Sequence, residues 1–396
     1  MNYDFIVFES YHLATHHIFD MILIARMLKS QGKTVAIFDI YHEIPENSRE
    51  NIPVIHWTSK CSVPDDKWRL RKHSVFETGI KFVTFCFQQK KYMNEALSFI
   101  KDKASAFYCG SYHNGMSTIF FQLQKPCYWW GLRSERLHFS YKKVLISPIH
   151  SIQVLLERRR FIRNPYQRLF VSNQIIMEEH NRLGIPLDRM IIREERVVEH
   201  TTDANLSSLD NNISFLVIGQ LRKAKHIPTT IEAFRHADIP DAKLKLIGRA
   251  QEEYEKVIEH TINGDNRILR RNEYLEYDDF YKNISKSHFV LFADEAGPSC
   301  ITNGTMTEAL INHRPIICPD YNPYKYYVEK YGFGILYKSG DTDSYAKAMR
   351  KGAELGVRHF LPAIEKFLNE IQFDVVSKNF VDEINKQMSA DRNVYK

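Results

Sequence analysis

Short apolar runs alternate with stretches of helical periodicity at the start of the chain. Residues 5–8 form one apolar run, and apolar side chains then recur at helical spacing from Ile18 to Leu28. Gly32 ends this helical pattern, and residues 34–38 form a second apolar run. A strand, a helix that stops at a glycine and another strand make up a βαβ unit with parallel strands. The pattern predicts that the chain begins as an α/β domain.

The alternation is less regular through the middle of the first half. Residues 82–87 fit either a strand or a buried turn of helix, whereas residues 106–109 are typical of a strand. Residues 169–172 predict a further strand, and the helix expected over residues 173–183 ends at a Gly-Ile-Pro turn.

The second half repeats the alternation more clearly. Apolar runs of strand length occur at residues 215–218, 244–247, 268–269, 289–292, 315–318 and 335–337. Helical patterns separate them and are clearest over residues 228–236 and 305–312. We therefore predict an α/β fold of two Rossmann-like domains, with a ligand cleft lined by the carboxyl ends of the strands.

A polar stretch marks the expected boundary between the two domains. The chain has 396 residues, more than one hydrophobic core usually fills. Residues 201–212 are rich in Thr, Ser, Asn and Asp and predict a linker between domains over residues 1–200 and 213–375. Residues 376–396 are expected to form a helix that packs back on the N-terminal domain.

Charge is distributed unevenly along the chain. The formal net charge is +6, but residues 1–200 carry 28 Lys and Arg against 20 Asp and Glu, a surplus of 8. A basic N-terminal domain favours contact with an anionic membrane surface, an anionic acceptor or nucleic acid, and an ordinary solvated surface explains the charge equally well. No nucleic-acid-binding motif accompanies it, so we expect no nucleic-acid partner.

The apolar runs and the cysteines bear on localisation. No run is long and apolar enough to predict a membrane span, and Asp4 and Glu9 make the N-terminus a poor signal peptide. The six cysteines include no C-x-x-C pair, and four of them lie in apolar or strand-like segments, as reduced buried thiols usually do. We expect a cytoplasmic protein that can also lie at the inner face of the membrane.

The first chemical motif follows the strand expected at residues 215–218. Gly219 allows the backbone to approach a ligand closely, and Arg222 and Lys225 come just before a predicted helix. Cationic side chains at a helix N-terminus can neutralise a diphosphate. Basic residues in a loop are also common in solvated turns, so the motif alone does not decide the function.

The second motif follows the strand expected at residues 289–292. The small and polar residues Thr302, Asn303 and Gly304 lead into a helix that carries Glu308 near its first turn. Free N–H groups at such a turn suit a phosphate or sugar hydroxyl, and a carboxylate there suits a ribose diol. The alternative is a plain strand-to-helix turn in which Glu308 favours the helix dipole.

Together these motifs resemble the C-terminal domain of GT-B glycosyltransferases, especially the retaining glycosyltransferase family 4. The segment from Gly219 to His226 is similar to the family pattern G-R-L-x-x-x-K-G, and the segment from Glu308 to Ile317 is similar to the end of its E-x7-E motif. The resemblance extends over about residues 213–345 and includes Arg249. It implies that Lys225 binds the donor phosphate and that Glu308 contacts the nucleotide ribose.

The chain departs from the family pattern at three positions. Gln220 replaces the motif arginine, His226 replaces the glycine after the lysine, and Cys300 replaces the first glutamate of E-x7-E. Arg222 is a candidate to supply the missing guanidinium. Because the first glutamate normally contacts the donor sugar, its replacement bears on which sugar is transferred.

His113 is the candidate catalytic residue of the N-terminal half. It follows the strand expected at residues 106–109, where similar enzymes place a histidine that faces the donor sugar. An imidazole there can hydrogen-bond a sugar hydroxyl or stabilise charge as the glycosidic bond breaks. The alternative is a histidine that only caps a loop.

No metal ion or other cofactor is expected. The acidic pairs Asp65-Asp66 and Asp278-Asp279 lack Asp-x-Asp spacing after a strand. Helix N-termini and cationic side chains can stabilise a leaving diphosphate without a metal.

A basic helix is the candidate membrane or acceptor contact. Pro148 begins a pattern with apolar residues at helical spacing, and Arg158, Arg159 and Arg160 follow it. An apolar stripe beside arginines fits anionic lipid or a lipid-linked pyrophosphate acceptor, and a core-facing helix with a basic end is the alternative.

We therefore expect a glycosyltransferase that moves a sugar from a nucleotide-sugar donor to a saccharide or lipid-linked acceptor, in bacterial surface polysaccharide or glycolipid synthesis. Two other functions remain open at this point. One is a UDP-sugar epimerase of the GT-B fold, and the other is a non-catalytic GT-B scaffold or basic binding protein.

Overall fold

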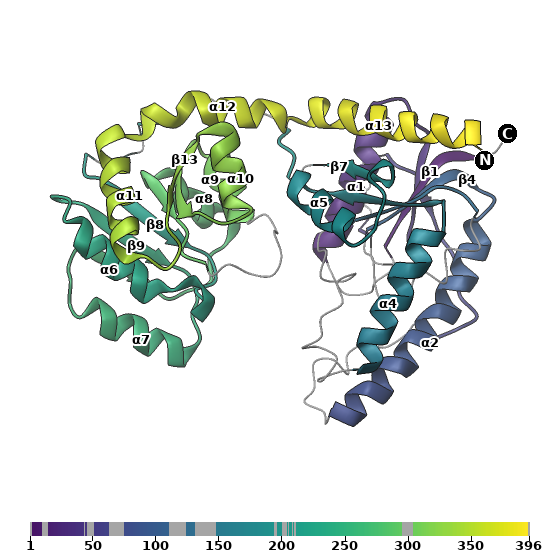
Figure 1. Cartoon of the computed structure of the whole chain (residues 1–396), viewed down its shortest axis with the longest axis horizontal. Helices are drawn as coiled ribbons and strands as arrows, with labels where there is room; N and C mark the ends of the chain where they lie inside the picture. Colours follow the sequence, from purple (N-terminus) through teal and green to yellow (C-terminus); the bar gives the residue numbers. More distant parts are fainter. Residues whose placement is uncertain are drawn as a thin grey trace. The chain divides into compact units, whose positions relative to one another are not determined.

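The structure is a computed structural model, and the chain divides into two compact units (Figure 1). Unit 1 comprises Met1–Glu194 and Val376–Lys396, and unit 2 comprises Glu195–Val375. The structure describes residues 2–9, 15–42, 44–45, 51–62, 75–110, 124–130, 148–193, 196–199, 204, 206–207, 209, 211–294 and 304–394.

Unit 1 contains a seven-stranded sheet in the order β3-β2-β1-β4-β5-β6-β7. Every neighbouring pair is parallel, and the buried strands are almost wholly apolar, as expected for a sheet covered on both faces. The strands are β1 (Tyr3–Phe8), β2 (Val35–Phe38), β3 (Val54–Ile55), β4 (Ala104–Cys109), β5 (Cys127–Trp130), β6 (Gln167–Val171) and β7 (Met190–Ile192).

Helices follow the strands of unit 1, and one of them resolves an ambiguity of the sequence. Its helices are α1 (Thr15–Ser30), α2 (Val75–Ile100), α4 (Pro148–Arg163), α5 (Gln174–Arg182), the 3-10 turn η5 (Leu187–Arg189) and α13 (Phe373–Val394). Residues 82–87 lie within α2 and are helical. Met93, Leu97 and Ile100 of the same helix are fully buried at helical spacing, which is a stronger signal than the short apolar run alone.

Unit 2 contains a six-stranded parallel sheet in the order β10-β9-β8-β11-β12-β13. This is the order of a doubly wound Rossmann-like domain. Its strands are β8 (Ser214–Ile218), β9 (Lys243–Ile247), β10 (Ile268–Arg271), β11 (Phe289–Leu291), β12 (Ile316–Pro319) and β13 (Gly334–Tyr337). Its helices are η6 (Lys223–Lys225), α6 (Ile227–Ala237), α7 (Glu252–Ile262), α8 (Tyr277–Ser285), α9 (Gly304–Ile311), α10 (Tyr324–Tyr331), α11 (Thr342–Leu355), η7 (Val357–Phe360) and α12 (Leu361–Glu370).

The chain enters unit 2 before the polar stretch at residues 201–212. The division falls after Glu194, and Val198 already pairs with Gln372, just after α12. The Val198 N–H donates to Ile371 O at 2.9 Å, and the Phe373 N–H donates to Val198 O at 2.9 Å. Most of α13 falls with unit 1, where Phe380 packs edge-on against Phe170 at 4.6 Å between ring centroids. Among the described residues, no helix combines the length and apolarity needed to cross a membrane.

Candidate donor site in unit 2

The sheet of unit 2 has its topological switch point between β8 and β11. The chain moves from β8 outward to β9 on one side, and from β11 outward to β12 on the other. Gly219 follows β8, and Asp294 lies just beyond the end of β11. Ligands of open parallel sheets bind outside the carboxyl ends of the strands at this point. The first sequence motif therefore begins at the expected ligand site of unit 2.

Two glycines bring the loops after β8 and β9 into contact. A Cβ on Gly248 would lie 1.9 Å from Gly219 O, so only glycine fits at position 248 without backbone movement. Both glycines have positive φ, 92° for Gly219 and 137° for Gly248. The Leu221 N–H donates to Arg249 O at 2.9 Å and extends the pairing beyond the strands. The Gly219 loop is thereby fixed relative to the sheet.

Lys225 extends from η6 back toward the end of β8. Its Nζ donates to Ile218 O at 3.1 Å, and a Cβ on Gly219 would lie 3.8 Å from this Nζ. Burial lowers the pKa of Lys225, the Asp294 carboxylate opposes this shift, and the Arg222 charge adds to it. The Lys225 ammonium therefore lies at the switch point, beside the end of β8.

Arg222 is exposed and is oriented by Gln220. The Arg222 Nε and Nη2 atoms donate to Gln220 Oε1 at 3.0 and 2.7 Å. Gln220 occupies the position of the motif arginine. The nearest guanidinium, that of Arg222, lies two residues later, and the Gln220 side chain holds it. The role of Arg222 as a replacement for the missing arginine stays a prediction.

His226 occupies the position of the motif glycine and has an unusual backbone conformation. It adopts the left-handed conformation, with φ 43° and ψ 47°, between η6 and α6. Glycine adopts this conformation without steric cost, and other residues do so at a cost of about 1–2 kcal/mol. The backbone at His226 is therefore one that a glycine would adopt more easily.

Glu308 lies in the second turn of α9 and is already engaged. It accepts a hydrogen bond from the Tyr281 hydroxyl on α8 and lies 3.9 Å from Arg196 Nη1. Burial and then the contact with Glu308 raise the pKa of Tyr281. The Arg196 guanidinium also approaches the start of α9, because a Cβ on Gly304 would lie 3.1 Å from its Nη2. A carboxylate, a phenol and a guanidinium therefore gather at α9.

A pocket of about 420 Å³ adjoins the outer side of the Gly219 loop. It is lined by Gln220, Leu221, Arg222 and Lys223 from the loop and by Gln251, Glu253, Tyr254 and Val257 from the start of α7. Neither Lys225 nor Glu308 lines it. Of the residues predicted to bind the donor, this pocket is lined by Arg222. Arg249 is exposed beside Gly248 and contributes its backbone carbonyl to the loop.

Several predicted residues lie outside the described part of the chain. These are His113, Thr302, Asn303 and Cys300. The roles proposed for them from the sequence stay predictions.

The sequence analysis did not identify three polar residues of this candidate site, which are Asp294, Arg196 and Tyr281. Asp294 follows a predicted strand, and this position at the carboxyl end of a strand could have identified it as a site residue. Arg196 and Tyr281 reach Glu308 from other elements, and no spacing in the sequence indicates such contacts.

A buried arginine at the carboxyl edge of the unit 1 sheet was also missed. Arg193 follows β7, pairs with Asp20 of α1 at 3.2 Å, and lies over the Trp130 ring at 4.0 Å from its centroid. Its side chain is fully buried. The ion pair fixes α1 to the end of β7.

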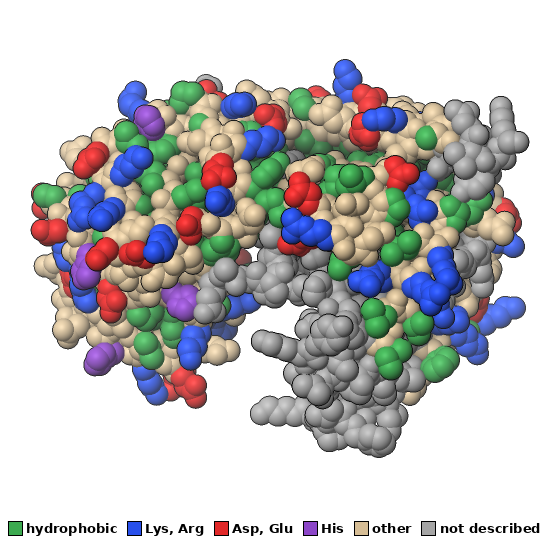
Figure 2. All heavy atoms as spheres, in the orientation of Figure 1, with side chains coloured by type: hydrophobic (Ala, Val, Ile, Leu, Met, Phe, Trp, Pro, Cys, Tyr) green, Lys and Arg blue, Asp and Glu red, His purple; other side chains and the backbone are tan. Residues whose placement is uncertain are grey.

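The basic helix forms as predicted, over Pro148–Arg163 as α4. Its apolar residues Ile152 and Leu156 are 58% and 47% exposed, so these two side chains do not face a core. Arg159 is exposed, and Arg158 and Arg160 are partly exposed. Figure 2 shows basic and hydrophobic side chains close together on this part of unit 1.

Acidic pairs do not form a metal site in the described residues. Asp278 and Asp279 are exposed on the first turn of α8, and Asp65-Asp66 lies outside the described residues. The group of side chains there that could hold a metal ion is Asp39, His42 and His56 in unit 1. The predicted absence of a metal from the donor chemistry stays a prediction.

Comparison with known proteins gives a family match for the part of the chain that carries the candidate site. Residues 200–356 match the family model described as glycosyl transferases group 1. This match covers the sheet of unit 2, so residues 200–356 are similar to a group 1 glycosyltransferase domain. No curated protein sequence matches the chain significantly.

Solved structures share the fold of this chain across nearly its whole length. HepE (Alr3699) of Anabaena, solved in complex with UDP, is 12% identical, with a TM-score of 0.66 over 98% of this chain and 100% of HepE. The lipopolysaccharide outer core galactosyltransferase WaaB is 14% identical, with a TM-score of 0.64 over 97% and 99% of the two chains. A putative UDP-N-acetylglucosamine 2-epimerase from Listeria monocytogenes is 13% identical, with a TM-score of 0.56 over 97% and 96%. The GT-B fold is confirmed, and membership of family 4 stays a prediction.

Proposed function

We propose that this glycosyltransferase uses a nucleotide-sugar donor whose diphosphate binds at the loop after β8. The observation that carries the proposal is the Lys225 ammonium, 3.1 Å from Ile218 O at the switch point of unit 2. A dianionic diphosphate is the donor group that such a cation would bind, and Arg222 lies in the same loop. The group 1 domain match and the UDP complex of HepE support the same reading.

In the proposed reaction, the bond between the sugar C1 and the diphosphate oxygen breaks while a bond from an acceptor oxygen to C1 forms. The acceptor hydroxyl loses its proton, and the nucleoside diphosphate leaves with the negative charge. Lys225 and Arg222 stabilise this charge as it develops, which makes a metal ion unnecessary for the step. Retention of configuration at C1 is proposed from the resemblance to family 4.

Glu308 is proposed to bind the ribose of the donor nucleotide. Its carboxylate can accept hydrogen bonds from a vicinal diol. The contacts with Arg196 and Tyr281 orient this carboxylate. Thr302, Asn303 and Gly304 are proposed to supply N–H groups at the start of α9. His113 is proposed to face the donor sugar from unit 1.

The acceptor is proposed to be a saccharide or a lipid-linked saccharide of a bacterial surface polymer or glycolipid. The exposed apolar residues and arginines of α4 support contact with an anionic membrane. Sedimentation with phosphatidylglycerol vesicles tests this contact. Replacing Arg158, Arg159 and Arg160 with glutamine is expected to abolish it, whereas replacing the exposed Lys347 and Lys351 of α11 is not.

The experiment that tests the function is a thermal-shift panel of UDP-, GDP- and CMP-sugars with the full chain. A donor at 100 times its Kd stabilises the folded protein by about 2.7 kcal/mol, which gives a measurable increase in Tm. We expect one nucleotide class to raise the Tm. If none does, the nucleotide-sugar proposal fails.

A UDP-sugar epimerase is the second candidate, because an epimerase shares this fold. The two reactions differ in their need for an acceptor. A transferase releases UDP in proportion to added acceptor, whereas an epimerase converts its donor without one. The group 1 match favours the transferase.

A further inference from the structure

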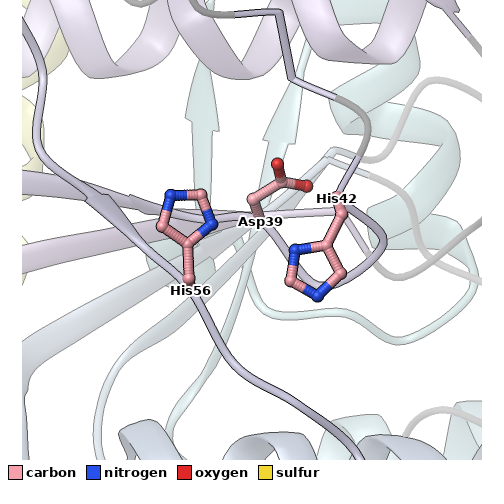
Figure 3. Close-up of side chains that lie close together, drawn as sticks. All are labelled: Asp39, His42 and His56. Carbon is pink, nitrogen blue, oxygen red and sulfur yellow. The ribbon is translucent and has the colours of Figure 1, made fainter.

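Three side chains that can bind a metal ion converge at the carboxyl ends of β2 and β3 in unit 1. Asp39 follows β2, His56 follows β3, and His42 lies in the loop after β2. Their ligand atoms all lie within 4.8 Å of one another. Figure 3 shows a nitrogen of each imidazole on the side that faces Asp39.

The hydrogen bond between His42 and Trp57 sets the tautomer of the His42 ring and leaves one ring nitrogen suited to bind a metal. Nε2 of His42 lies 2.8 Å from Trp57 O, and a carbonyl oxygen can only accept, so Nε2 carries the proton. In the neutral ring, Nδ1 then has a free lone pair. Histidines that bind metals commonly donate their other N–H to a backbone carbonyl in this way.

The core of unit 1 holds the three residues in place. Trp57 is buried and packs edge-on against Tyr92 of α2, at 5.2 Å between ring centroids. The Tyr92 hydroxyl donates to Ile40 O at 3.1 Å, so the same side chain fixes the chain on both sides of the cluster. Asp39 is 4% exposed, and its Oδ2 accepts from the Ile44 N–H at 3.2 Å. The backbone is therefore fixed, while both imidazoles remain accessible.

The distances suit a small transition-metal ion after a modest closure. Zn²⁺ binds imidazole nitrogen and carboxylate oxygen at about 2.0–2.2 Å, which separates tetrahedral ligands by roughly 3.4 Å. The His42 and His56 rings are nearly parallel, with 9° between planes and 6.0 Å between centroids. His42 is held through its Nε2 contact with Trp57 O, so rotation of the exposed His56 side chain is the movement expected to close this spacing.

We propose that Asp39, His42 and His56 form a zinc-type site with two imidazoles, one carboxylate and an open coordination position. The bound ion would join the segments after β2 and β3. It would thereby secure β3, which is an edge strand of only two residues. The proposal depends on unit 1 alone and is independent of the donor chemistry proposed for unit 2.

The test measures Zn²⁺ binding to the untagged full chain, stripped of metal with a chelator, by competition with a chromogenic zinc chelator. The His42→Gln/His56→Gln variant is compared with a His260→Gln/His359→Gln control, in which two exposed histidines of unit 2 are replaced. We expect wild type and control to bind one equivalent alike and the His42/His56 variant to bind at least about tenfold more weakly. Zn²⁺ should also raise the Tm of wild type and control but not of the variant.

Equal zinc affinity in all three proteins would overturn the proposal, as would the absence of a zinc-dependent Tm increase in wild type. Circular dichroism establishes that each variant is folded. If the double variant does not fold, His56→Gln alone replaces it, because the His56 ring is exposed. Visible d–d absorption of the Co²⁺-loaded protein reports the nitrogen and oxygen ligands directly, and its loss in His56→Gln is the expected result.

Discussion

The guanidinium of Arg222 donates two hydrogen bonds to the side-chain oxygen of Gln220. Gln220 stands where similar enzymes carry an arginine, so the pair explains how a changed motif keeps a cation in the same loop. The amide anchors the guanidinium, and the guanidinium remains exposed toward solvent.

Exchanging these two residues tests this account. Arg222→Gln should weaken UDP binding roughly 10- to 150-fold, because a hydrogen bond to a charged group contributes about 1.5–3 kcal/mol. The double variant Gln220→Arg/Arg222→Gln should recover most of the loss, since the guanidinium returns to the motif position. Calorimetry with UDP measures both. A single variant that binds like wild type, or a double variant with no recovery, would contradict the compensation.

The contact between Gly219 and Gly248 makes a prediction about stability. Gly248→Ala should lower the free energy of unfolding by about 2–4 kcal/mol, because the new Cβ would meet Gly219 O and force the loop apart. Gly264→Ala is the matched control. That residue has φ 72° with no atom near the new Cβ, so only the backbone cost of about 1 kcal/mol is expected. Urea denaturation distinguishes the two, and equal losses would show that the loop contact is unimportant.

The lowered pKa of Lys225 predicts a pH dependence of donor binding. Burial favours the neutral amine, so Lys225 should lose its charge below the ordinary lysine pKa of about 10.4. UDP affinity should then fall as pH rises toward that value. In Lys225→Arg, which stays protonated, this fall should be smaller. Both proteins share the titration of uracil and of the other side chains, so parallel profiles would refute the role of Lys225.

The same shift fixes the sign of the effect on folding. The folded state binds its Lys225 proton less tightly than the unfolded chain does, so the Lys225 contribution to stability is greatest above the unfolded pKa. It is lost as pH falls through the lowered folded pKa. As pH rises from the folded to the unfolded pKa of Lys225, the unfolding free energy of wild type should therefore increase relative to that of Lys225→Met.

The regular part of this fold was predictable because parallel strands buried on both faces are continuous apolar runs. The six strands of unit 2 were expected at their observed places, and Gly219 and Lys225 followed from their position after the first of them. The two-residue β3 was missed, since Val54 and Ile55 are too few to form a pattern. The α7, α8 and α10 boundaries were likewise not resolved, because tertiary packing defines them more than periodicity does.

Contacts between elements that are far apart in the chain could not be predicted from the sequence. Glu308 was singled out from its motif, but its partners Arg196 and Tyr281 come from segments with no recognisable signal. The cluster of Asp39, His42 and His56 was missed for the same reason, because the register of β2 and β3 brings its members together. His226 was noted as a departure, and its left-handed backbone shows why glycine is usual there.

The central claim is that the loop after β8 binds the donor diphosphate through Lys225. Calorimetric titration of UDP into wild type, Lys225→Met and Lys223→Met tests it directly, because Lys223 is an exposed lysine of the same short helix. We expect Lys225→Met to weaken UDP binding about 10- to 100-fold. Lys223→Met should stay within about twofold of wild type, as an exposed charge does. Unchanged UDP affinity in Lys225→Met, with the protein folded, would contradict the account.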